Sequence, residues 1–151
     1  MPPWQRRSGD GPVAIQLTAS DGKGGQATDS RTVTIGTMTG RWSFIFTGEC
    51  SPHTPTVLPV LTLTQTASAV TGTLESPAPW CNVPAGQTGK LDPAAPASID
   101  AKGNFTGARL KIGDYVDTFL TGKMDSTGRK ITGVASFRFG IPDDTFEMVK
   151  Q

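Results

Sequence analysis

A short motif that occurs five times constrains the fold of this chain more than any other feature of its sequence. It is an apolar residue followed by Thr and Gly, and the copies are Met38-Thr39-Gly40, Val70-Thr71-Gly72, Phe105-Thr106-Gly107, Leu120-Thr121-Gly122 and Ile131-Thr132-Gly133. A Gly inside a strand usually marks a bulge or a sharp bend, and a sheet that closes into a barrel needs such points on successive strands. The motif therefore predicts a strongly curved antiparallel sheet.

The rest of the composition also favours strands over helices. The 151 residues include 18 Gly and 12 Pro, and no stretch of eleven or more residues keeps a helical apolar spacing without one of them interrupting it. A chain of this length has room for one main hydrophobic core. We therefore expect an all-β fold, an antiparallel up-and-down barrel of about eight strands with an N-terminal β-hairpin.

Alternating apolar and polar residues locate the strands of the expected barrel, which spans residues 38–151. The strands are predicted at residues 41–47, 60–66, 69–75, 98–101, 104–112, 115–124, 130–139 and 145–149. Segment 76–97 is rich in Pro, which cannot donate to a ladder, so we expect a loop over one barrel end with at most a short strand near 87–91. Eight strands leave room for packed side chains or for one small ligand.

The N-terminal part of the chain has a different character. Residues 1–12 lack the apolar region of a signal peptide and are interpreted as a disordered start or a vector-derived scar. Residues 13–37 hold two alternating runs around a turn-rich segment, which predicts a β-hairpin. An isolated hairpin is marginal in water, so this one should dock on the following domain, exchange with another copy or stay mobile.

Two parts of the sequence resemble known families. Residues 15–35 are similar to the last two strands of PKD-like and cadherin-like immunoglobulin-type domains, which implies a spacer or adhesion role upstream. Gly40-Arg41-Trp42 resembles the Gly-x-Trp start of the lipocalin and avidin barrels, and the strings ending in Thr-Gly resemble small lipocalin-like barrels of bacterial secreted proteins. The second resemblance implies that Trp42 packs under a basic residue of a late strand, for which Arg138 is the candidate. Alternatively, Trp42 is an ordinary core aromatic.

The two cysteines lie in Pro-rich, loop-like segments. In an exported all-β domain, Cys50 and Cys81 are best interpreted as one disulfide that closes a loop of about thirty residues and stabilises the fold by roughly 3 to 4 kcal/mol. A thiol nucleophile or a metal ligand paired with His53 is the alternative. One His and two Cys do not fill a usual structural zinc site, so no metal site is predicted.

The functional hypothesis is a binding module for a small apolar or aromatic ligand, or for a surface carbohydrate or protein partner. The candidate ligand-binding residues are Trp42, Phe44, Trp80, Tyr115, Phe119 and Phe137. Trp42 shares one strand face with Phe44 and Phe46 and should be buried near one barrel end, whereas loss of Trp80, in a loop, should be tolerated structurally. The alternative is a small hydrolase that uses Ser51 and His53, or Cys50 and His53, near the barrel mouth. A structural segment without a ligand of its own is the third possibility.

Charge and hydropathy narrow the range of partners. The net charge is +1 and the Lys and Arg residues are scattered, so a nucleic-acid partner is not expected. No segment approaches the ~20 apolar residues of a membrane span. Asp143 and Asp144 are interpreted as turn residues, because no Asp-x-Asp-x-Asp-Gly run supports calcium there, and no cofactor is predicted. The Thr, Gly, Ser and Ala content is typical of an exported bacterial domain, which predicts a secreted or cell-surface location.

Overall fold

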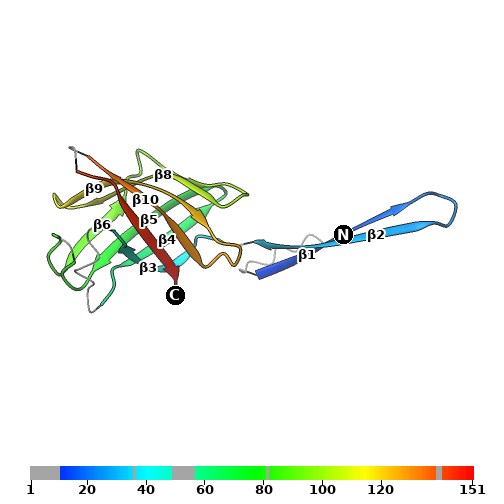
Figure 1. Ribbon diagram of the computed structural model, residues 1–151, viewed down its shortest axis with the longest axis horizontal. Helices are drawn as coiled ribbons and strands as arrows, with labels where there is room; N and C mark the ends of the chain where they lie inside the picture. Colours follow the sequence, from blue (N-terminus) through cyan, green and yellow to red (C-terminus); the bar gives the residue numbers. More distant parts are fainter. Residues whose placement is uncertain (1–10, 36, 49–56, 81, 139–140) are drawn as a thin grey trace.

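The computed structural model describes residues 11–35, 37–48, 57–80, 82–138 and 141–151, with the backbone alone for 11–15 and 31–35. Within these ranges there is no helix of the length and apolarity that a membrane crossing requires. The strands, seen in Figure 1, are β1 (Gly11–Ser20), β2 (Gln26–Ile35), β3 (Gly40–Phe46), β4 (Val60–Thr66), β5 (Ala69–Ser76), β6 (Gln87–Leu91), β7 (Ala97–Ile99), β8 (Asn104–Ile112), β9 (Val116–Met124), β10 (Lys130–Phe137) and β11 (Asp144–Lys150).

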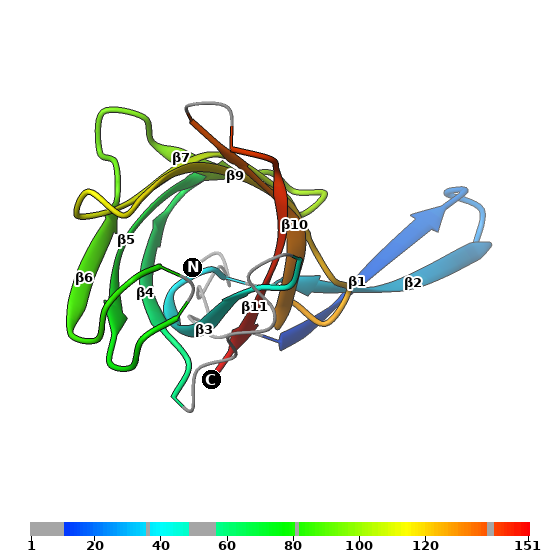
Figure 2. The same ribbon diagram turned by 60° about the vertical axis from the view of Figure 1, so that its left-hand side comes forward.

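Strands β3 to β11 form one closed antiparallel barrel. Except for β6 and β7, strands that follow one another in sequence pair in the sheet, and β11 pairs with β3 to complete the ring (Figure 2). One position, between β5 and β8, is shared by β6 and β7, which pair with different parts of the same two strands. The nine strands therefore occupy eight positions, and the predicted up-and-down barrel of about eight strands is confirmed.

The two ends of the barrel differ in the length of their connections. At one end, which we call the mouth, the described residues of the connections are 47–48, 57–59, 77–80, 82–86, 113–115, 138 and 141–143. At the other, which we call the turn end, they are the short links 67–68, 100–103 and 125–129. The hairpin precedes β3 at the turn end, so it extends from the side of the barrel opposite the mouth (Figure 1).

Carboxylates stabilise the tight links of the turn end. Asp100 accepts hydrogen bonds from the backbone N–H groups of Lys102 and Asn104 and from the Asn104 side chain. The Asn104 hydrogen bonds hold the pKa of Asp100 below its ordinary value. The pKa of Asp100 is lower in the folded than in the unfolded protein. The stabilisation of the fold by the ionised Asp100 carboxylate is therefore present above the unfolded pKa and is lost as the pH falls through the folded pKa.

Aromatic side chains of β3 occupy the barrel interior. Trp42 and Phe44 are fully buried, and Phe46 is nearly so, which confirms the prediction that this face points inward. The Trp42 indole N–H donates to the carbonyl oxygen of Met38 at 2.8 Å, so its one polar atom is paired. Phe44 stacks on Phe146 of β11 with ring centroids 5.8 Å apart, across the seam that closes the barrel.

The Thr-Gly motif has a clear structural role. In every copy the apolar residue is buried, and the Thr is exposed. Phe105, Gly122, Gly133, Phe146 and Phe46 form one row across β8, β9, β10, β11 and β3. A Cβ on Gly122 would lie 3.1 Å from the ring of Phe146, and one on Gly133 would overlap the carbonyl oxygen of Thr121. The glycines thus leave the space in which strands approach and Phe rings pack.

One copy of the motif forms the bulge that a Gly inside a strand predicts. Gly107 has a φ of +75° and lies where the β8–β9 register shifts between Phe105 and Ala108. A bulge with Gly in the left-handed region inserts one residue and bends its strand.

The predicted hairpin is present as a sheet of its own. β1 and β2 pair in register from Gly11 opposite Ile35 to Ser20 opposite Gln26. Asp21 accepts hydrogen bonds from the backbone N–H groups of Lys23 and Gly25 in the connecting turn. The side chains of residues 16–30 are exposed, Leu17 among them, so this part of the hairpin does not pack on the barrel.

Replacing Gly133 by Ala should destabilise the barrel severely, because the added methyl group meets the β9 backbone. We expect a loss of about 3 kcal/mol or more in the free energy of unfolding, measured by urea denaturation. Gly86→Ala is the control, since nothing lies within 4 Å of a Cβ there and only its φ of +76° opposes the change, at about 1 kcal/mol. Equal losses in the two variants would contradict the steric role of Gly133.

Candidate ligand-binding site

A pocket of about 120 Å³ lies at the mouth of the barrel. Four different parts of the chain supply its walls: the end of β3, the β5–β6 connection, the β8–β9 turn, and the segment around the β10–β11 connection. The described lining residues are Phe46, Asn82, Val83, Tyr115, Val116, Phe137, Ile141, Pro142, Asp143 and Asp144. Two of the predicted ligand-binding residues, Tyr115 and Phe137, are therefore brought together here, although they are distant in sequence.

The inner wall of the pocket is aromatic. Phe46 and Phe137 have ring centroids 5.3 Å apart, and Phe46 stacks on Trp80 at 5.0 Å. At the outer edge Tyr115 is 52% exposed and Ile141 is 57% exposed, so large apolar surface faces solvent beside the opening. The pocket is thus apolar on its inner side and open at its rim, as is usual for small-ligand sites.

The position of Trp80 corrects one sequence-based expectation. Trp80 is in a loop, as predicted, but it is only 2% exposed and packs against Phe44 and Phe46 inside the barrel. Reciprocal backbone hydrogen bonds of 3.1 and 2.9 Å join it to Val83, also buried, and this short bridge turns both side chains inward. The sequence does contain a signal for this burial, because Trp80 and Val83 are the only large apolar residues of segment 77–86.

Two buried polar atoms belong to residues that adjoin the pocket lining. The indole N–H of Trp80 and the hydroxyl of Thr118 are buried, and neither has a hydrogen-bond partner among the described residues. Trp80 contacts the lining residue Phe46, and Thr118 lies opposite the lining residue Phe137 in the β9–β10 register. Burial without a partner costs roughly 1 to 3 kcal/mol per group, so such atoms need a physical explanation.

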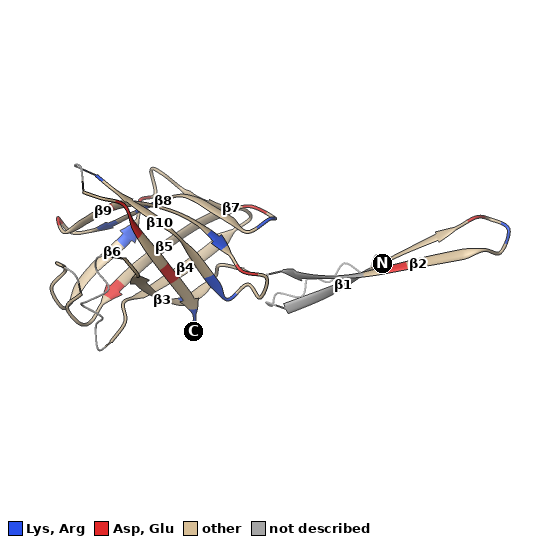
Figure 3. Cartoon of the chain, viewed as in Figure 1, with Lys and Arg blue, Asp and Glu red and all other residues tan. Residues whose placement is uncertain are grey.

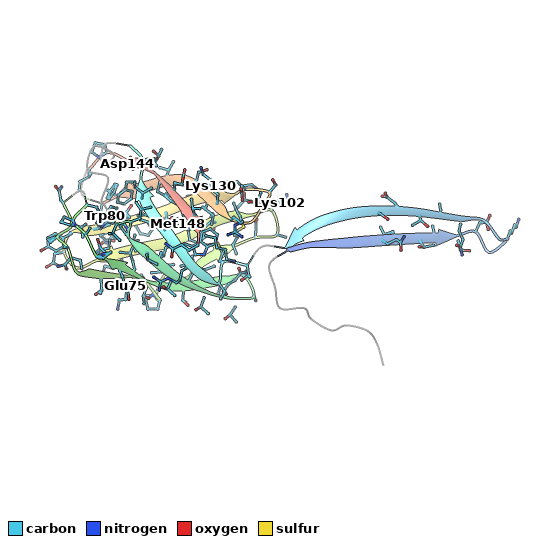
Figure 4. All side chains as sticks on the ribbon, turned by 90° about the horizontal axis from the view of Figure 1, so that it is seen from below. Glu75, Trp80, Lys102, Lys130, Asp144 and Met148 are labelled. Atoms are coloured by element: carbon cyan, nitrogen blue, oxygen red, sulfur yellow. The ribbon has the colours of Figure 1, made fainter. Side chains whose placement is uncertain are left out.

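Two carboxylates form the charged part of the described pocket lining. Asp143 accepts a hydrogen bond from the Ser136 hydroxyl at 3.1 Å, and Asp144 accepts one from the backbone N–H of Thr145 at 2.7 Å. Asp144 is largely buried and lies at the same end of the barrel as Trp80 (Figure 4). Among the described residues, no three His, Cys, Asp or Glu side chains gather as metal ligands would.

The remaining predicted ligand-binding residues lie elsewhere. Trp42 and Phe44 are core residues that do not line the pocket. Phe119 is on the outer face, where the guanidinium groups of Arg109 and Arg138 lie 5.7 and 5.8 Å from its ring centroid. The alternation of β9 explains this placement, since Phe119 is out of phase with the inward-facing Thr118 and Leu120.

The basic residue beside Trp42 is Lys150, which corrects the expectation for Arg138. The Lys150 ammonium lies 5.8 Å from the Trp42 ring centroid and donates to the carbonyl oxygen of Thr37 at 2.8 Å. Arg138 follows the inward-facing Phe137 and so points outward, where it lies 3.7 Å from Asp117. The basic partner therefore comes from the last strand and not from the end of β10.

Asp117 is the centre of an ion-pair cluster on the outer face. Arg109 donates to both of its carboxylate oxygens, at 2.8 and 2.6 Å, and to Asp92 at 3.2 Å. The Arg109 hydrogen bonds hold the pKa of Asp117 below its ordinary value, and they raise that of Arg109. Elsewhere, the positions of basic and acidic residues are spread along the strands and turns of the barrel (Figure 3).

Four of the predicted functional residues lie outside the described residues: Cys50, Ser51, His53 and Cys81. The disulfide and the hydrolase alternative both stay predictions.

Truncating Trp80 to Ala should destabilise the protein about as much as truncating Trp42, by roughly 3 to 5 kcal/mol, because each removes a large buried ring. The free energy of unfolding can be followed by far-UV circular dichroism in urea. Tyr115→Ala is the control and should change stability by less than about 0.5 kcal/mol, since that ring is half exposed. A parental stability for Trp80→Ala would contradict its interior packing.

Thr118→Val should stabilise the protein, because it replaces an unpartnered buried hydroxyl by a methyl group of the same shape. We expect a gain of about 1 kcal/mol and a rise in melting temperature of about 3 °C. Thr121→Val, on the exposed face of the same strand, is the matched control and should leave the melting temperature nearly unchanged. A lower melting temperature for Thr118→Val would show that the hydroxyl has a partner.

Comparisons with protein-family models, with curated proteins and with solved structures give no match for this chain.

Proposed function

We propose that this barrel is a binding module that takes a small ligand at its mouth. The ligand's apolar or aromatic body would lie between Phe46, Val83, Val116 and Phe137. The observation that carries the proposal is the apolar pocket. Two residues that adjoin its lining, Trp80 and Thr118, each hold a buried polar atom without a hydrogen-bond partner among the described residues. Apolar walls with a few nearby polar groups are the usual composition of a small-molecule site.

The size of the pocket limits the ligand. An engineered protein cavity of about 150 Å³ accommodates benzene, so a pocket of about 120 Å³ suits a group of about one ring. Because the pocket is open at the rim, the rest of a longer molecule, such as the sugar of a surface carbohydrate, would extend past Tyr115 and Ile141. Their exposed side chains offer it apolar contact area.

The resemblance to the lipocalin and avidin barrels supports the same proposal. Here Gly40 and Trp42 belong to the first barrel strand, and a basic residue of the last strand, Lys150, lies over the Trp42 ring. That resemblance implies one barrel end closed by Trp42 and a ligand admitted at the other. An exported location agrees with this proposal and with the composition of the chain.

Binding can be tested with 4-nitroanisole, a neutral one-ring probe whose absorption overlaps tryptophan emission. We expect saturable quenching of the protein's fluorescence, because Trp80 lies behind the pocket. Tyr115→Ala should weaken binding about tenfold, which corresponds to about 1.4 kcal/mol.

The matched control is Phe119→Ala, which removes an exposed ring of the outer face and should leave the dissociation constant unchanged. Quenching that does not saturate, or an equal loss of affinity in both variants, would contradict a site at the mouth.

A further inference from the structure

The charged residues among the described lining of the pocket are of one sign. Asp143 and Asp144 are part of its lining, and none of the described lining residues is Lys, Arg or His. The nearest basic residue along the chain, Arg138, points to the outer face, where it contacts Asp117 and Phe119. The charged residues of the described lining are therefore all acidic, and negative charge attracts a cation and repels an anion.

Asp143 also has the hydrogen-bonding capacity that a cationic donor requires. An ionised carboxylate accepts about four hydrogen bonds, and Ser136 donates one of them to Asp143. Asp143 is exposed at the rim, so a ligand donor reaches it without disturbing the core. Hydrogen bonds between an ammonium group and a carboxylate are stronger than those between neutral groups.

Aromatic rings beside these carboxylates favour the same ligand chemistry. Tyr115, Phe137 and Phe46 line the pocket together with Asp143 and Asp144, and the face of an aromatic ring attracts a cation. This chain already holds its own cations in such a setting, since Arg109 and Arg138 lie over Phe119 and contact Asp117. The mouth offers the same combination of ring and carboxylate. On the outer face arginine side chains occupy the space beside the ring, whereas at the mouth that space is a pocket.

We infer that the ligand is a small organic amine, with its ammonium group at Asp143 and Asp144 and its apolar body against Phe46 and Phe137. This inference rests on the proposed function, because it assigns the chemical class of the ligand to the same pocket. Val83 and Val116 complete the apolar side, which receives the hydrocarbon part of the amine.

Three one-ring probes of nearly equal shape separate the effect of charge from that of size. Benzylamine is cationic at neutral pH, benzyl alcohol is neutral and benzoate is anionic. Each is titrated against the full chain by isothermal calorimetry at one ionic strength. We expect benzylamine to bind at least tenfold more tightly than benzyl alcohol, and benzoate to bind most weakly.

Asp143→Asn identifies the group responsible, because it removes one charge from an exposed side chain and keeps its shape. The preference for benzylamine over benzyl alcohol should fall at least threefold. Asp114→Asn is the matched control: it removes an exposed carboxylate at the same barrel end, outside the pocket lining, and should leave the preference intact.

The outcomes distinguish this inference from the function on which it rests. Equal affinities for benzylamine and benzyl alcohol would overturn the inference and leave the binding function standing. No binding of either probe would overturn both. An undiminished preference in Asp143→Asn, or an equal reduction in Asp114→Asn, would overturn the assignment of the ammonium group to the pocket carboxylates.

Discussion

Closing eight strands into a narrow ring brings β9 and β10 so close at Gly122 and Gly133 that neither residue has room for a side chain. The space they leave is occupied from either side, since Phe105 is the register partner of Gly122 and Phe146 that of Gly133. The same two glycines therefore allow the sheet to curve and leave the space that the Phe rings fill in the core. The seam between β11 and β3 depends on it as well, because Phe146 continues the row to Phe46.

The same row connects the packing of the barrel to its mouth. Phe46 ends the row and begins the pocket, and through its ring it contacts both Trp80 and Phe137. A shift of the β3 register would move Phe46 and so disturb its contacts with both other rings. The candidate site is thus built on the rigid sheet and completed by loops, an arrangement that holds pocket side chains more accurately than loops alone.

Sequence patterns predicted the fold better than the site, for physical reasons that particular residues make clear. Alternation and the Thr-Gly motif depend on local geometry, so strands, inward faces and the bulge at Gly107 could be predicted from them. The burial of Trp80 was missed, because it depends on a bridge to Val83 inside a Pro-rich loop. Likewise, the partner of Trp42 is set by the β3–β11 seam, which brings Lys150 to that ring.

The hairpin and the pocket lie at opposite ends of the barrel, so the chain enters the barrel at one end and the pocket opens at the other. β3 begins and β11 ends at the turn end, so both covalent connections of the barrel leave from the side away from the pocket. Any neighbouring domain joined through either connection would therefore attach to the barrel at the end opposite the pocket. The opening would face outward, and ligand access would not depend on what the chain is tethered to.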